Sequence, residues 1–306
     1  MTTVLLGGAS GFIGSELTRA LEHDGHRVAR LSRRATPDGV LWNAEQGSLD
    51  RAALDRVAPD IVINLAGEPI AQRWTPTTRR KIRDSRVRGT AGLAAALASM
   101  SSKPRLFIGG SAIGYYGAHR GDDVLDESSS PGDDWLGRVG QEWEQAARPA
   151  ADAGIRVVIS RTGVVLGEDG GMLQRMLLPF RLGIGGRLGS GSQWLSWIAM
   201  EDYVRAIQFV IATPSLAGPI NVVAPEPVRN AELTKALGRA LGRPTIIPVP
   251  EFALQLLFGR MANDTILASQ RVVPKKLAGA GFEFRHPRVE QALRAALTRS
   301  GGRDDR

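Results

Sequence analysis

The chain contains no cysteine, so disulfide bonds, a thiolate nucleophile and a cysteine-based metal site are excluded. The four histidines, at positions 23, 26, 119 and 286, do not have the spacing of metal ligands, and no metal site is expected. No apolar run approaches the length of a membrane span, and the first residues lead directly into a strand pattern instead of a signal peptide. These absences predict a cytoplasmic protein with no membrane partner.

Acidic residues are fewer than basic ones, which gives the 306-residue chain a formal net charge of +8. Basic surfaces attract nucleic-acid phosphates. The arginines are nevertheless spread from Arg19 to Arg306, are interrupted by acids, and form no stripe interleaved with aromatic residues. We therefore expect no nucleic-acid partner and a small-molecule substrate instead. The sequence leaves a monomer and a homodimer open.

A glycine-rich run lies near the N-terminus, in Gly8-Ala-Ser-Gly11-Phe-Ile-Gly14. It follows the apolar stretch Thr3–Leu6 and precedes an amphipathic helix pattern over Phe12–Glu22. Glycines at this spacing allow a tight turn off a strand and a close approach of backbone N–H groups to phosphate, and the positive end of the next helix favours an anion. The run predicts a dinucleotide site that includes Gly8, Ser10, Gly11, Phe12, Ile13 and Gly14.

The end of the second predicted strand, Arg27–Leu31, indicates which dinucleotide is bound. About twenty residues past the glycines, NAD-binding proteins of this architecture place an acid on the ribose hydroxyls. This chain has Ser32, Arg33 and Arg34 there instead. A hydroxyl and two guanidinium groups suit a 2′-phosphate, which a carboxylate would repel. NADP(H) is therefore favoured over NAD(H). The alternative is that both arginines are only exposed loop charges.

Strand and helix patterns alternate through the first two-thirds of the chain. The strand candidates are Thr3–Leu6, Arg27–Leu31, Ile61–Leu65, Leu106–Ile108 and Val157–Ser160, and the longest helix candidates are Pro76–Ala98 and Asp134–Ala153. The alternation predicts an α/β fold with a Rossmann-like doubly wound parallel sheet and a smaller C-terminal substrate domain.

Glycine-rich loops and proline-bounded segments from Gly167 onward indicate where the second domain begins. We expect residues 1–166 to form the NADP(H)-binding domain, with 200–224 returning to it. Residues 167–199 and 225–299 then form the substrate-side domain, and 300–306 form a disordered tail.

Two further strand tips complete the predicted ligand edge, Asn64-Leu-Ala-Gly67 and Gly109–Gly117. Ligands of open α/β sheets bind at this carboxyl edge, which adds Leu65, Ala66 and Gly67 to the expected cofactor contacts. Together with the glycine run and Ile198–Asp202, these tips resemble the extended short-chain dehydrogenase/reductase superfamily, in its nucleotide-sugar epimerase and dehydratase branch.

A closer resemblance, which extends over nearly the whole chain, is to an epimerase-like subfamily with a small extra C-terminal domain. The matching segments are Gly67–Ala71, Arg73-Trp74, Ser85-Arg86, Gly114–Gly117, Gly170-Gly171, Leu178–Phe180, Ser196–Ile198 and Pro274–Phe284.

The superfamily resemblance implies a catalytic serine on the fifth strand, which Ser111 matches, and a tyrosine followed four residues later by a lysine. If Glu144 is the helix glutamate of the superfamily, Leu136 and Gly140 occupy the places of that tyrosine and lysine. The chain has only three tyrosines, and neither a tyrosine nor a lysine lies on this helix. Another group must therefore carry out acid–base chemistry, or the protein binds NADP(H) without catalysis and acts as a sensor.

Two side chains are candidates for the missing acid–base group. Glu68 follows a strand tip beside the expected nicotinamide, and its alternative role is to contact the ribose or to orient the loop. Tyr116 matches the tyrosine of the Tyr-Gly pair that lines the substrate pocket in the superfamily. Arg73, Arg86 and Tyr115 are the expected substrate contacts, and Arg86 has a salt bridge to a neighbouring helix as its alternative role.

Overall fold

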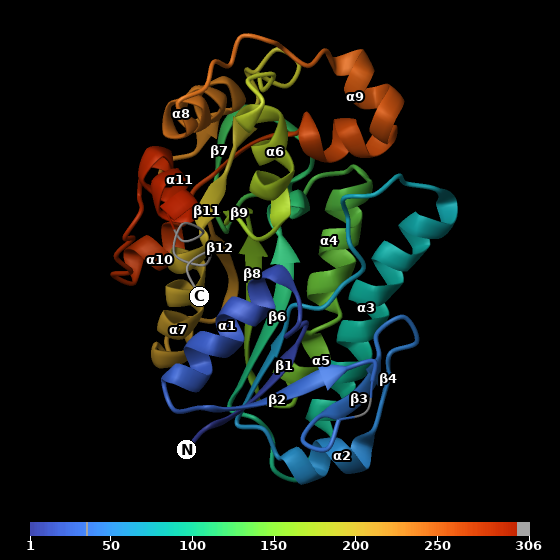
Figure 1. Ribbon diagram of the computed structural model, residues 1–306. Helices are drawn as coiled ribbons and strands as arrows, with labels where there is room; N and C mark the ends of the chain where they lie inside the picture. The colour runs from blue at the N-terminus through green and yellow to red at the C-terminus, as the bar shows by residue number, and fades with distance from the viewer. Residues whose placement is uncertain (35, 299–306) are drawn as a thin grey trace. The chain divides into compact units, whose positions relative to one another are not determined.

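The computed structural model describes residues 1–34 and 36–298, which form two compact units (Figure 1). Unit 1 comprises Met1–Tyr115, Arg138–Arg161 and Gln208–Ile220, and unit 2 comprises Tyr116–Gly137, Thr162–Ile207 and the chain from Asn221. This division differs from the expected boundary at residue 166, because 116–137 packs within unit 2. The returning segment is also shorter than expected. The tail at 300–306 lies outside the described residues.

Unit 1 is built on an eight-stranded sheet with the strand order β12-β8-β6-β5-β1-β2-β3-β4. β1 pairs in parallel with β2 and β5, β5 with β6, and β2 with β3, whereas β3 and β4 are antiparallel. The predicted Rossmann-like α/β fold is confirmed. The strands are β1 (Thr3–Gly7), β2 (Arg27–Ser32), β3 (Val40–Asn43), β4 (Ser48–Leu49), β5 (Ile61–Asn64), β6 (Leu106–Ala112), β8 (Arg156–Thr162) and β12 (Gly218–Val222).

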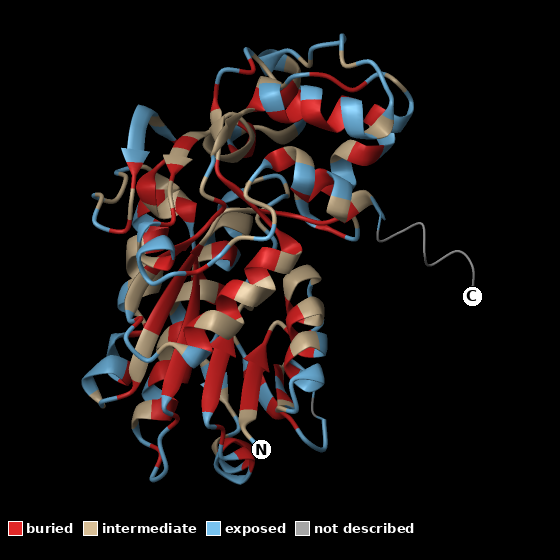
Figure 2. Cartoon of the chain, turned by 90° about the vertical axis from the view of Figure 1, so that its left-hand side faces the viewer, coloured by how far each residue is buried: buried red, intermediate tan, exposed pale blue. Residues whose placement is uncertain are grey.

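Alternating side chains of β1 explain why this sheet is covered on two faces. Successive residues of a strand point to opposite faces. Leu5 belongs to a buried cluster that includes residues of α2, α3 and α5, while its neighbours Val4 and Leu6 are also fully buried. Figure 2 shows the central strands buried along most of their length. The helices of this part of the chain are α1 (Phe12–His23), α2 (Arg51–Val57), α3 (Pro76–Ala98), α4 (Trp135–Gln145) and α5 (Arg148–Asp152). α7 (Met200–Ala212) belongs to unit 2 up to Ile207 and to unit 1 from Gln208.

The helix expected over Asp134–Ala153 is divided into α4 and α5. Proline lacks a backbone N–H and is tolerated in the first turn of a helix, but not in its interior. Pro149 lies in the first turn of α5, so the chain ends one helix and begins another at this point.

Unit 2 has short strands in pairs and a helical core. β7 (His119–Leu125) pairs with β14 (Ser269–Val272), β9 (Val164–Leu166) with β11 (Trp197–Ala199), and β10 (Trp194–Leu195) with β13 (Val228–Arg229). The core joins Leu177 of α6, Trp197, Leu237 of α8 and Leu293 of α11. The helices that lie wholly in this unit are α6 (Gly171–Arg181), α8 (Asn230–Leu241), α9 (Glu251–Phe258), α10 (Lys275–Gly279) and α11 (Val289–Thr298), with a π-helix over Ala262–Ile266.

None of the helices in residues 1–34 and 36–298 is both long enough and apolar enough to cross a membrane.

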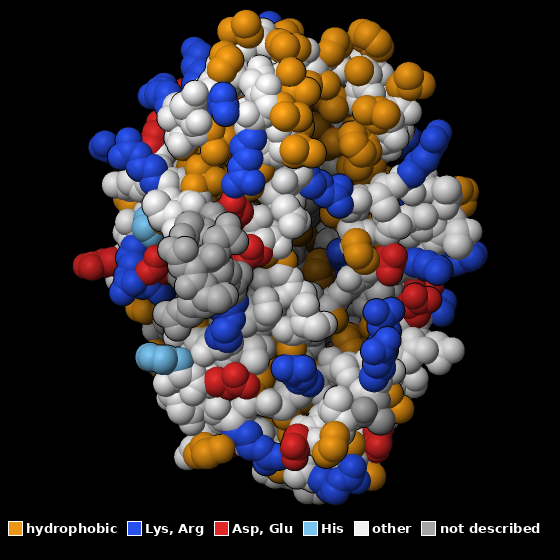
Figure 3. All heavy atoms as spheres, viewed as in Figure 1, with side chains coloured by type: hydrophobic (Ala, Val, Ile, Leu, Met, Phe, Trp, Pro, Cys, Tyr) orange, Lys and Arg blue, Asp and Glu red, His pale blue; other side chains and the backbone are white. Residues whose placement is uncertain are grey.

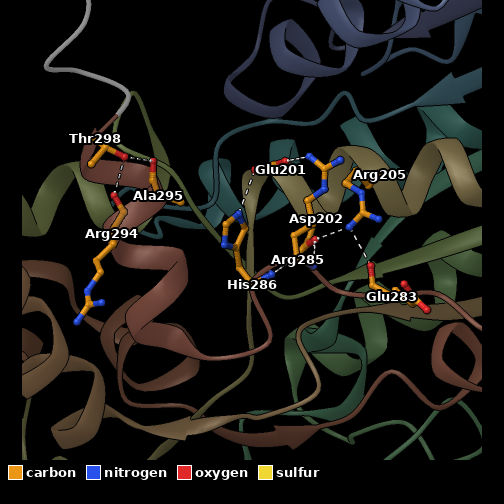
Figure 4. Close-up of polar contacts among 9 residues, drawn as sticks. All are labelled: Glu201, Asp202, Arg205, Glu283, Arg285, His286, Arg294, Ala295 and Thr298. Atoms are coloured by element: carbon orange, nitrogen blue, oxygen red, sulfur yellow. Dashed lines mark hydrogen bonds and ion pairs between the residues drawn. The ribbon is translucent and has the colours of Figure 1, made fainter.

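Two acids in the first turn of α7 hold the segment that follows α10 (Figure 4). Asp202 is fully buried, and its carboxylate accepts the backbone N–H groups of Arg285 and His286, each at 2.8 Å. The adjacent Glu201 bonds to the Arg285 guanidinium and lies 3.0 Å from Nε2 of His286. These contacts tie two segments of unit 2 that are distant in sequence.

The Glu201 contacts predict a loss of stability in acid. Burial disfavours its charged form, but the hydrogen bonds from His286 and Arg285 outweigh burial, so the pKa of Glu201 lies below its ordinary value of 4.5. A carboxylate with a lowered pKa stabilises the fold above the unfolded-state pKa and loses this contribution as the pH falls through the folded-state pKa. We expect Glu201→Gln to flatten the fall of melting temperature below about pH 4.5. Glu22→Gln, which changes an exposed glutamate, is the control. If the melting temperature of Glu201→Gln falls with pH as steeply as that of the wild type, the assignment is contradicted.

Candidate functional site

The glycine turn between β1 and α1 has the close backbone packing that its sequence predicts. Gly8 has a φ of +82°, a left-handed conformation that favours glycine, and its carbonyl accepts the N–H of Gly11 at 2.9 Å. A Cβ atom on Gly14 would lie 2.0 Å from the Gly8 carbonyl oxygen. The N-cap of α1 is Gly11, which provides no side-chain cap. The first-turn N–H groups of α1 are therefore suited to bind an anion.

The tip of β5 packs directly against this turn. Leu65 donates its backbone N–H to the carbonyl of Gly7 at 3.0 Å, and Ala66 donates to Oδ1 of Asn64 at 3.2 Å. A Cβ on Gly8 would approach the backbone nitrogen of Ala66 to 3.1 Å. The structure thus brings the expected cofactor residues of 8–14 and 65–67 together at one edge of the sheet.

The tip of β2 carries the residues expected at the 2′-phosphate. Ser32 Oγ bonds to the backbone carbonyl of Arg34 and accepts its N–H at 3.3 Å, so the hydroxyl shapes the turn. Arg33 and Arg34 are exposed, and neither has an ion-pair partner within the part of the chain that the structure describes. Both guanidinium groups are therefore available to an anionic ligand.

A buried ion pair lies behind the tip of β6. Ser111 donates its hydroxyl to Oε1 of Glu144 at 2.8 Å, and Arg161 of β8 binds both carboxylate oxygens of Glu144 at 2.8 Å. The side chains of Arg161 and Glu144 are only 3% and 13% exposed. The hydroxyl of Ser111 is oriented by this pair, and its oxygen keeps lone pairs that can accept a further hydrogen bond. Sequence reasoning missed Arg161, because no local pattern connects it with Glu144.

Tyr115 packs beside the position where the superfamily resemblance implies a lysine. The guanidinium carbon of Arg161 lies 3.5 Å from the centroid of the half-buried Tyr115 ring. A Cβ on Gly140 would lie 3.0 Å from Cα of Tyr115. A larger residue at position 140 would therefore crowd Tyr115. Tyr115 and Arg161 place a phenol and a cation close together without the usual pair.

Tyr116 occupies a different environment from its neighbour. It is fully buried in unit 2, and its hydroxyl donates to Oδ1 of Asn221 at 2.7 Å. A hydroxyl that is buried and already bonded is poorly placed to exchange a proton with a ligand. The geometry favours a packing role for Tyr116 over the proton transfer that its sequence position suggested.

Glu68 lies in a bonded loop after β5. Its backbone N–H donates to Oγ of Ser85 at 3.0 Å, and its Oε1 accepts Nε2 of Gln72 at 3.0 Å. Arg86 donates from Nη1 to the carbonyls of Glu68 and Ile82, each at 3.0 Å. Ser85 and Arg86, both on α3, therefore hold the backbone of Glu68 in the loop after β5.

The two arginines expected at the substrate differ in their surroundings. Arg73 is exposed between β5 and α3. Burial lowers the pKa of Arg86 to about 10, although the charge of Glu68 raises it, so this guanidinium remains charged at neutral pH. Arg86 donates to two backbone carbonyls, and its guanidinium carbon lies 5.1 Å from the centroid of the Trp143 ring on α4. The sequence suggested either the substrate or a salt bridge to a neighbouring helix.

The described residues contain no group of three or more acids or histidines that could hold a metal ion.

Comparisons with known proteins agree with this architecture. Residues 4–223 match the family model of the NAD dependent epimerase/dehydratase family, and 249–296 match a domain of unknown function, DUF1731. An epimerase family protein of Mycobacterium tuberculosis is 47% identical over 301 residues, which cover 97% of this chain and 98% of that protein. The human epimerase family protein SDR39U1 is 36% identical, with 95% of this chain and 98% of that protein covered.

Two solved structures are similar over 97% of the chain. The crystal structure of human SDR39U1 with NADPH has a TM-score of 0.88 at 34% identity, and 99% of that chain is covered. The nucleoside-diphosphate sugar epimerase from Corynebacterium glutamicum has a TM-score of 0.80 at 36% identity, with 58% of that chain covered. The resemblance predicted from the sequence, including the extra C-terminal domain, is confirmed.

Proposed function

Because the chain belongs to the NAD-dependent epimerase/dehydratase family, we propose that it binds NADP(H) and acts as an epimerase or reductase on a nucleotide sugar or another anionic small molecule. The glycine turn and the first turn of α1 would hold the pyrophosphate, and the tip of β5 would lie along the cofactor. The cofactor would supply the hydride, while the residues of the chain bind, orient and exchange protons.

The observation that carries the proposal is the pair of exposed arginines at the tip of β2, which form no ion pair with a carboxylate of residues 1–34 and 36–298. The structure of human SDR39U1 with NADPH supports the same choice of cofactor. Arg73 would add positive charge for an anionic substrate.

Arg33 is expected to discriminate between the two cofactors. A hydrogen bond to a charged group contributes about 1.5–3 kcal/mol, so Arg33→Ala should weaken NADPH binding about 10- to 100-fold and leave NADH binding almost unchanged. Titration calorimetry with both cofactors measures this difference. Arg30→Ala, on the exposed side of the same strand, is the control. Equal losses for NADPH and NADH would remove the 2′-phosphate assignment.

Proton transfer must come from a group other than the usual tyrosine–lysine pair. Three groups near the strand tips are available for this chemistry: the Glu68 carboxylate, the Ser111 hydroxyl held by Glu144, and the Tyr115 phenol beside Arg161. We assign the acid–base step to Glu68, substrate positioning to Ser111, and a substrate contact to Tyr115.

Glu68→Gln is expected to reduce turnover by at least about 100-fold, because an amide cannot exchange the proton. NADPH affinity should remain within about twofold, since no phosphate contact is assigned to Glu68. Turnover is followed as the absorbance of reduced nicotinamide after fractionated metabolites are added. Glu45→Gln, on an exposed loop, is the control. A fully active Glu68→Gln protein would eliminate Glu68 as the acid–base group.

The second candidate function is a non-catalytic NADP(H) sensor. The packing of Tyr115 against Gly140 favours it, because that space cannot hold a lysine without rearrangement. Tight NADPH binding without a change of absorbance in any metabolite fraction would favour the sensor over a redox enzyme.

A further inference from the structure

Exposed hydrophobic side chains gather on one part of unit 2 (Figure 3). Eight large side chains form what we call the apolar face, and the most exposed are Ile246, Leu256 and Phe252, at 81%, 77% and 71%. Single exposed apolar residues are ordinary, whereas a group of this size marks an interaction surface. The apolar face consists of Leu178, Leu182, Ile184, Ile246, Ile247, Phe252, Leu256 and Leu257.

Backbone contacts join these residues into one surface. Gly189 donates its N–H to the carbonyl of Val249 at 2.8 Å, and Val249 donates to the carbonyl of Arg187 at 2.9 Å. A Cβ on Gly186 would lie 1.7 Å from the carbonyl oxygen of Ile247. The loop after α6 therefore runs beside the loop before α9, and the two loops bring both helices into the same face.

The charges around this face are almost all of one sign. Segments 171–191 and 235–261 contain Glu251 as their only acid. Arg181 at the end of α6 and its C-cap residue Leu182 lie about one helical turn beyond Leu178, so basic and apolar side chains are neighbours. Arg181 also pairs with Glu168 at 2.7 Å. The basic residues of these segments are all exposed: Arg175, Arg181, Arg187, Lys235, Arg239, Arg243 and Arg260.

We propose that the apolar face docks on an anionic lipid bilayer. Side chains exposed by more than two-thirds protrude from the surface and suit a penetrable partner. Apolar groups of this kind enter the boundary between headgroups and acyl chains, while neighbouring arginines attract anionic headgroups. The sequence predicted no membrane partner because it lacks a spanning segment, but a protein that lies on a bilayer needs none.

A second copy of the chain is a poorer occupant for the apolar face. In a two-fold symmetric interface the same surface meets itself. The basic residues of one copy would then lie close to those of the other, and Glu168, which pairs with Arg181 at 2.7 Å, and Glu251 would offset only part of that charge. Like charges brought together in this way oppose association.

Sedimentation of the 306-residue chain with vesicles tests this proposal. We expect binding to vesicles of phosphatidylglycerol and phosphatidylcholine, no binding to phosphatidylcholine alone, and weaker binding as salt is raised. The Phe252→Ser/Leu256→Ser variant should lower the partition coefficient at least about tenfold, since two protruding apolar groups are lost. Leu41→Ser, which changes an exposed leucine of unit 1 (44%), should behave as the wild type.

Several outcomes would overturn the proposal. One is an absence of binding to anionic vesicles, and another is equal binding by the wild type and the Phe252→Ser/Leu256→Ser variant. Dimerisation in light scattering that this variant abolishes would assign the face to a second copy instead. Circular dichroism and NADPH binding confirm that each variant is folded. If the double variant does not fold, Arg243→Glu replaces it, and the same loss of anionic-vesicle binding is expected.

Discussion

Replacing Arg161 with methionine is expected to lower the free energy of unfolding by about 3–5 kcal/mol. Arg161 binds both carboxylate oxygens of Glu144, and both side chains are nearly excluded from water. Arg161→Met leaves the Glu144 carboxylate charged and without its cation, and burying an unpaired charge is far more costly than burying a pair. Urea denaturation followed by circular dichroism measures the change.

The double variant Arg161→Met/Glu144→Leu is the matched control. Because it removes both charges, it should recover most of the stability that Arg161→Met loses. A loss below about 1 kcal/mol in the single variant is typical of an exposed pair, and would contradict the buried arrangement of Ser111, Glu144 and Arg161.

Gly14→Ala is expected to abolish detectable NADPH binding. Its added Cβ would lie 2.0 Å from the carbonyl oxygen of Gly8 and 2.7 Å from the carbonyl carbon, and both of these are backbone atoms that cannot rotate away. The turn between β1 and α1 would have to open, which displaces the first-turn N–H groups that we assign to the pyrophosphate. Titration calorimetry with NADPH tests this expectation.

Gly279→Ala is the control for a general effect of the substitution, since nothing lies within 4 Å of the Cβ that it adds. It should bind NADPH as the wild type does. Wild-type affinity in Gly14→Ala would show that the cofactor does not depend on this turn.

The elements with strong local signals were predictable from the sequence. The helix expected over Pro76–Ala98 has those bounds in the structure, because Thr75 caps it by accepting the N–H of Thr78 and Pro76 starts it. β1 and α1 follow from the glycine run between an apolar and an amphipathic segment. β3 and β4 were not predicted, because four and two residues are too few to show a period.

The candidate site was only partly predictable for a related reason. The residues of the glycine turn are contiguous, so their proximity follows from the sequence. The Glu144–Arg161 pair joins α4 to β8, and that contact depends on how helix and sheet pack. Tyr115 and Tyr116 are neighbours in the same motif, yet one stacks on Arg161 and the other is buried against Asn221. No sequence pattern separates these two roles.

The most direct test of the account is a calorimetric comparison of NADPH and NADH binding to the wild-type protein at one ionic strength. The exposed Arg33 and Arg34, without a carboxylate to hold the ribose hydroxyls, predict that NADPH binds at least about tenfold more tightly. Equal affinities, or tighter binding of NADH, would contradict the assignment of this site to NADP(H).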